Sequence, residues 1–141
     1  MSNAGTTRET QFASAANRRR AVTVALWVLQ VLLALQFVMA GFAKVFGEQA
    51  MVEMFATIGI GQWFRYVVGA LEIAGAIGVL IPRLSGLAAL GLACLMAGAT
   101  LTNLLVLGTS PLLPIGLLVV SALVAWGRCP ETRSLAAGFG R

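Results

Sequence analysis

The sequence contains no histidine and only two cysteines in 141 residues. Without histidine, the commonest protein ligand of haem, zinc and copper is missing. Cys94 falls inside an apolar run and Cys129 follows the last such run, so there is neither a CxxC redox motif nor a disulfide framework. No phosphate-binding loop or nucleophile motif is present either. These absences argue against an autonomous enzyme and against a metal site.

Charged residues are also scarce. They make up 11% of the chain, hydrophobic residues make up 59%, and the mean hydropathy is +0.90. This composition is too apolar for a soluble domain. Apolar windows at residues 21–43, 63–81, 86–107 and 111–126 indicate spans, which must be helical because lipid offers the backbone no hydrogen-bond partners. We therefore predict an all-α, membrane-embedded four-helix bundle.

The bundle is predicted to occupy residues 21–126, between a disordered basic tail (residues 1–20) and a polar tail (residues 127–141). Four spans would place eight of the ten basic residues on the side of both termini. By the positive-inside rule that side is cytoplasmic, and we predict a multi-pass protein of the bacterial inner membrane. The basic run then sets topology beside anionic lipid and does not bind nucleic acid. The eight residues are Arg8, Arg18, Arg19, Arg20, Arg83, Arg128, Arg133 and Arg141.

The loop at residues 45–61 is the longest between the predicted spans. Apolar residues recur at helical spacing within residues 51–58, and polar residues spaced by four lie on the opposite face. This pattern predicts a short helix in the outer membrane interface, ended by the glycines at positions 59 and 61. Such a helix would either cover the mouth of the bundle as a lid or pack on its neighbours.

Glu72 lies at the centre of the second window, near the bilayer midplane. Inserting a carboxylate at that depth costs about 2.5–3.5 kcal/mol, so it should face the protein interior, meet a partner or carry a proton. Lys44 ends the first window, and Arg65 shares a helical stripe with Glu72. We hypothesise that Glu72 pairs with Lys44, Arg65 or both. Gly69, on the same stripe, would let another backbone approach or leave room for a ligand.

Most polar side chains of the windows lie from the midplane outward, whereas the inner half is expected to be nearly pure hydrocarbon. Their stripes can converge on a polar pocket that opens to the outside. Because two cations would outnumber one carboxylate, an anionic or carbonyl-bearing guest is favoured. The candidate pocket residues are Gln36, Lys44, Arg65, Glu72, Thr100 and Asn103.

Four motifs resemble those of a known family. They are F-x-x-A-G-F-A-K at residues 37–44, I-G-I-G at 58–61, Y-x-x-G-x-L-E-I-A-G at 66–75 and L-I-P at 80–82. Over residues 21–126 the chain resembles the DoxX-like family of small four-helix membrane proteins. The resemblance implies a four-helix bundle and marks Lys44 and Glu72 as its motif positions. The family is diverse, so the resemblance does not fix an activity.

Three classes of function are consistent with these observations. The favoured one is a membrane subunit that binds a lipid-like or quinone-like molecule, a partner protein, or both. The second is a quinone-linked oxidoreductase subunit that receives electrons from a partner chain. The third is a small transporter or channel. Membrane lipid, a redox partner and further copies of the chain are the expected partners, and quinone is the one cofactor considered.

Overall fold

The structure, a computed structural model, describes residues 3–139 and shows only helices there. The prediction of an all-α protein is confirmed. The longest helix, α1, has 44 residues and is about 66 Å long. In chain order the elements are α1 (Asn3–Phe46), α2 (Gln49–Ile58), α3 (Gln62–Leu80), α4 (Ser85–Thr102), the π-helical turn η1 (Asn103–Leu107), α5 (Leu112–Gly127) and α6 (Cys129–Phe139).

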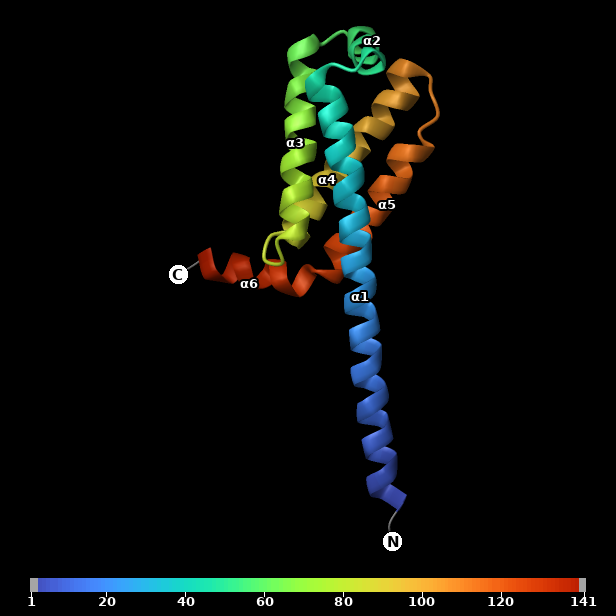
Figure 1. The fold of residues 1–141 in the computed structure, drawn as a ribbon, viewed down its shortest axis with the longest axis vertical. Coiled ribbons are helices and arrows are strands. Elements are labelled where there is room, and N and C mark those ends of the chain that lie inside the picture. The colour runs from blue at the N-terminus through green and yellow to red at the C-terminus, as the bar shows by residue number, and fades with distance from the viewer. Residues whose placement is uncertain (1–2, 140–141) are drawn as a thin grey trace.

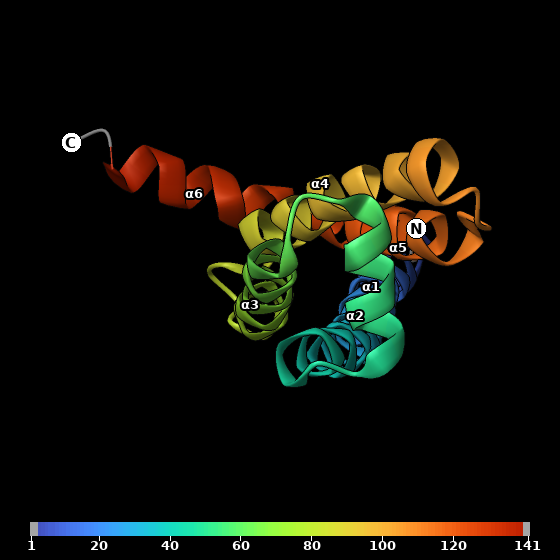
Figure 2. The same ribbon diagram turned by 90° about the horizontal axis from the view of Figure 1, so that it is seen from above.

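The long helices form two pairs that splay apart. Helix α1 packs along α3, and α4 packs along α5. The pairs lie close together near the α3–α4 turn and diverge toward the end that carries α2 (Figure 1). We call these the α6 end and the α2 end. At the α2 end, α2 contacts both α3 and η1 and thereby bridges the two pairs, as the view from above also shows (Figure 2).

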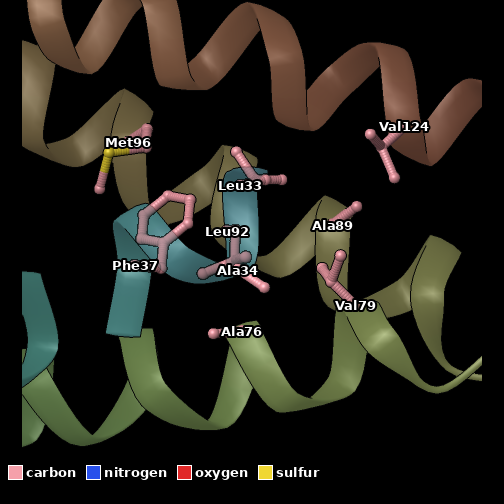
Figure 3. Close-up of a cluster of buried hydrophobic side chains, with 9 residues drawn as sticks. All are labelled: Leu33, Ala34, Phe37, Ala76, Val79, Ala89, Leu92, Met96 and Val124. Atoms are coloured by element: carbon pink, nitrogen blue, oxygen red, sulfur yellow. The ribbon is translucent and has the colours of Figure 1, made fainter. Parts of the chain in front are cut away.

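The buried core lies where the two pairs meet. Phe37 and Met96 lie at one end of the cluster and Val124 at the other (Figure 3). Large apolar side chains such as Leu71 and Leu105 are instead exposed on the outside, as expected for a protein surrounded by lipid. Alanine at three core positions lets the helices approach closely. The cluster comprises Leu33, Ala34, Phe37, Ala76, Val79, Ala89, Leu92, Met96 and Val124.

The predicted fourth span is shorter than the others. Within the described residues, three helical segments are long and apolar enough to cross a membrane: α1, α3, and α4 continued by η1. Helix α5 has 16 residues. It qualifies only together with α6, from which it is bent by 61°. The chain is therefore a membrane protein, and residues 3–139 contain three such segments, or four if α5 and α6 count as one bent span.

The N-terminal tail differs from its prediction. Residues 1–20 were expected to be disordered, whereas α1 begins at Asn3 and continues without a break into the first apolar window. The side chains of residues 5–25 are exposed, so this part of α1 packs against no other element. It therefore needs no apolar face, which is the pattern that would have predicted a helix here. Extending an existing helix adds one backbone hydrogen bond per residue without a new nucleus, which explains why the polar tail is helical.

The C-terminal tail was expected to be an irregular polar segment, but it contains α6. This helix is held against the bundle: a Cβ atom added at Gly86 in α4 would overlap the hydroxyl of Thr132 in α6. Figure 1 shows α6 lying across the bundle near the α3–α4 turn, roughly perpendicular to α1. Arg141, which was assigned to the cytoplasmic side, lies outside the described residues.

Candidate functional site

The site begins with a close approach of two backbones. A Cβ atom added at Gly41 in α1 would lie 2.8 Å from the carbonyl oxygen of Gly69 in α3, and one added at Gly69 would lie 2.9 Å from the carbonyl oxygen of Gly41. Only glycine fits such a contact without displacing a backbone. The expectation that Gly69 admits another backbone is confirmed, and the neighbour is α1.

This contact brings Lys44 beside Glu72. The ammonium nitrogen of Lys44 donates hydrogen bonds to both carboxylate oxygens of Glu72, at 3.0 Å and 2.9 Å. The side chains are 12% and 3% exposed, respectively. Two charge-assisted bonds neutralise the buried carboxylate and satisfy one hydrogen-bond site on each of its oxygens. Of the two predicted partners of Glu72, Lys44 and Arg65, it is Lys44 that forms the ion pair.

Arg65 has a different role. Its guanidinium donates to the main-chain carbonyl of Lys44 and, at 2.9 Å, to the side-chain oxygen of Gln62. It also lies 4.4 Å from the centre of the Tyr66 ring. The carbonyl groups in the last turn of a helix lack intrahelical partners, so Arg65 caps the end of α1. It therefore stabilises the backbone beside the ion pair and does not bond Glu72.

A cavity of about 460 Å³ lies between the two splayed helix pairs. Its floor contains Phe37 and Met96 from the core, and Lys44 and Glu72 lie in its wall. Helix α2 forms its cover with four side chains, and α4, η1 and α5 line the wall across from α1 and α3. The four cover residues are Met51, Met54, Phe55 and Ile58.

The remaining predicted residues are divided between this cavity and its surroundings. Gln36 lines the cavity. Asn103 also lines it, while its side-chain amide donates to the carbonyl of Ser110 at 3.1 Å. Thr100 is outside the lining, and its hydroxyl donates to the carbonyl of Met96 at 2.8 Å. The neighbouring Thr102 lines the cavity instead. This part of the wall includes the start of η1, and π-helical turns often occur at functional sites.

The charges that line the cavity balance. Lys44 and Glu72 are the ionised side chains in its lining, and they bond each other. The expected surplus of positive charge is therefore absent at the cavity, because Arg65 is occupied at the end of α1. Such a site suits a neutral apolar molecule with a hydrogen-bonding head. Among the described residues, no group of His, Cys, Asp or Glu side chains is arranged to hold a metal ion.

A second polar cluster lies at the α6 end, where nearly pure hydrocarbon was expected. Gln30 is fully buried and donates to the carbonyl of Val79 at 2.6 Å. Its side-chain oxygen accepts from the guanidinium of Arg128 at 2.7 Å and 3.1 Å. Arg128 also pairs with Glu131 at 2.8 Å. We call Gln30, Val79, Arg128 and Glu131 the α6-end network.

Sequence reasoning missed this network because its members are far apart in the chain. Gln30 and Arg128 are 98 positions apart. The available signal was Gln30, one of two glutamines inside the first apolar window. Such a residue needs a hydrogen-bond partner in lipid, and a juxtamembrane arginine supplies one here.

The fold and site define a helical integral membrane protein with a buried ion pair beside a cavity between its helix pairs. The sequence model of the DoxX-like family matches residues 28–126, which cover α2, α3, α4, η1 and nearly all of α5, together with the part of α1 that carries Lys44. The chain belongs to the DoxX-like family. Comparisons with curated proteins and with solved structures give no match.

Proposed function

We propose that this protein is a membrane-embedded binding subunit whose cavity holds a neutral lipid-like or quinone-like molecule, alone or together with a partner protein. The observation that carries the proposal is the Lys44–Glu72 pair in the wall of an otherwise largely apolar cavity of about 460 Å³. A buried ion pair is often less stabilising than apolar side chains of equal volume. Its position beside open volume is explained if it meets the polar head of a ligand.

The proposed orientation places the α2 end at the outer face of a bacterial inner membrane. Arginine at positions 18–20, Arg83, Arg128 and Arg133 belong to the α6 end, which is cytoplasmic under the positive-inside rule. Helix α5, with 16 residues, is about 24 Å long and serves as a short fourth span. Helix α2 then lies in the outer interface above the cavity.

A quinone is one molecule of the required kind. Its carbonyl oxygens accept hydrogen bonds from an ammonium group, and its tail is apolar. The neutral cavity therefore also supports the second candidate, a quinone-linked oxidoreductase subunit that depends on a partner chain for electrons. A transporter is less well supported, because the buried core and the α6-end network fill the bundle below the cavity.

Native mass spectrometry of gently solubilised protein, followed by lipid extraction, tests the proposal. We expect a stoichiometric small molecule on the wild type and on a Gly116→Leu control. A Cβ atom at Gly116 meets nothing within 4 Å, and Gly116 is outside the cavity lining. The molecule should be lost from the double variant Lys44→Met, Glu72→Gln, which lacks the ion pair but, like the wild type, has no net charge at the site. A wild type that carries nothing would contradict ligand binding and direct attention to partner proteins.

A further inference from the structure

An apolar groove of about 340 Å³ follows the seam between α3 and α4. Every residue in its lining is a leucine, an alanine or a glycine, among them Leu71 and Gly78 from α3 and Leu87 and Gly91 from α4. Leu95 lines both this groove and the cavity. The two hollows therefore adjoin.

Where the cavity and the groove adjoin, near Leu95, they open toward the side of the bundle at the depth of the bilayer. Cys94 and Gly98 line the cavity, lie in the middle part of α4, and are exposed. A Cβ atom added at Gly98 or Gly91 would meet nothing within 4 Å, so there is open space beside both glycines. Because α4 with η1 is long and apolar enough to span a membrane, this opening meets hydrocarbon.

The α2 end is covered by comparison. Phe55 is buried beneath α2, and its ring centre lies 5.9 Å from that of Phe64 in α3. The side chain of Gln62 donates to the carbonyl of Val52 at 3.0 Å, which fastens α2 to α3. A molecule therefore meets fewer protein atoms when it approaches from the side than when it approaches through α2.

We propose that the cavity and the groove form one site for a neutral, single-chain amphiphile that enters from the bilayer between α3 and α4. Its polar head meets the Lys44–Glu72 pair, and its chain lies along the groove. The head is neutral because the ion pair is already balanced, and another charge at this depth would have no counter-ion. This inference rests on the proposed function and adds the ligand class, its route and its pose.

Photocrosslinking in liposomes tests the pose. The probe is N-dodecylacetamide with a diazirine halfway along the chain, and dodecanoate with the same diazirine is its charged counterpart. We compare Gly91→Leu, which fills the groove, with Gly116→Leu, which adds the same side chain at an exposed position on α5. The amide probe should label groove residues in the wild type and in Gly116→Leu. That labelling should be lost in Gly91→Leu and be absent with dodecanoate.

Equal groove labelling in Gly91→Leu and Gly116→Leu would overturn the pose, and equal labelling by both probes would show that any lipid chain fills the groove. If mass spectrometry finds a bound molecule but Gly91→Leu leaves labelling unchanged, the proposed function stands and this inference fails. If no molecule is bound and the amide probe labels neither hollow, both fail.

Discussion

Lys44 reaches into the bundle to Glu72, although it lies near the end of α1 and has a side chain long enough to extend outward. Its nitrogen is 3.0 Å and 2.9 Å from the two carboxylate oxygens. The Cβ atom of Lys44 is packed against Gly69, one turn from Glu72, so the glycine contact directs the side chain inward. The stability of α1 on α3 and the charge balance of the cavity therefore depend on the same lysine.

Removing the cation should be more damaging than removing the anion. We expect Lys44→Met to lower the free energy of unfolding by about 3–5 kcal/mol, because it leaves a buried carboxylate without its partner. Glu72→Gln should cost about 1–2 kcal/mol, for two reasons. The amide oxygen of the new side chain can still accept a hydrogen bond from Lys44, and the charged end of Lys44 can otherwise extend outward to water. Unfolding followed by circular dichroism in detergent measures both.

The double variant Lys44→Met, Glu72→Gln serves as the control for this prediction. It should be more stable than Lys44→Met alone, because no charge is left unpaired. If the two single variants are equally and only slightly destabilised, the ion pair has no structural role.

The Gly41–Gly69 contact gives a second prediction. Gly69→Ala places a methyl group 2.9 Å from the carbonyl oxygen of Gly41, so the helices must separate. We expect a loss of about 1–3 kcal/mol in the free energy of unfolding, typical of overpacking. Gly116→Ala, where the methyl group meets nothing, should instead be neutral or stabilise the helix by up to about 1 kcal/mol. A stable Gly69→Ala variant would show that α1 and α3 tolerate a wider spacing.

A third prediction concerns α2 as a lid. Phe55 is 4% exposed. Phe55→Gly removes about 1.5–3 kcal/mol of stabilisation that comes from burying this side chain. The form in which α2 is detached from the cavity should then be populated at least about tenfold more. The measurement is the rate at which a water-soluble maleimide labels Ala99→Cys, a cavity position, in a background without Cys94 and Cys129.

Phe46→Gly is the matched control for the lid. Phe46 lies at the same end of the bundle but is 79% exposed and stacks on Phe42. Its removal should leave the labelling rate unchanged. Equal rates in Phe55→Gly and the parent would make α2 a fixed packing element.

The α6-end network yields a fourth prediction. Gln30→Leu removes the oxygen that accepts two hydrogen bonds from Arg128, which is 8% exposed. We expect a loss of about 1.5–3 kcal/mol and faster tryptic cleavage after Arg133, because α6 loosens. Gln11→Leu, at an exposed position on α1, should change neither.

A double-mutant cycle with Arg128→Met separates coupling from simple loss of packing. The combined variant should be less destabilised than the sum of the single variants, because the two side chains act on each other. Additive losses would show that Gln30 and Arg128 stabilise the bundle independently.

The helices and the ion pair were accessible from the sequence for physical reasons. Long apolar windows in lipid have few options other than helix, and a carboxylate at the centre of one requires a partner. Lys44 was one of only two basic residues on the predicted outer side. The short helix α2 followed from its apolar spacing, and its end is confirmed at Gly59, which has a φ of 80°.

Other features depend on helix angles that periodicity does not encode. Arg65 shares a stripe with Glu72, yet its side chain turns to the end of α1, where Gly47 leaves room for it. Thr100 and Thr102 differ by two positions, and the orientation of α4 decides which of them lines the cavity. Gln30 and Arg128 meet only because α5 crosses α1 at the α6 end.

Because the two helix pairs splay apart, a small rotation of α5 about its contact with α1 would be amplified at the other end of the bundle. Helices α1 and α5 touch at the α6 end, where a Cβ atom at Gly127 would lie 2.7 Å from Leu26, and the cavity separates them at the other end. With α5 about 24 Å long, each degree of rotation about that contact moves its far end by about 0.4 Å. The width of the cavity near the α2 end is therefore set by the packing of α5 on α1 at the α6 end.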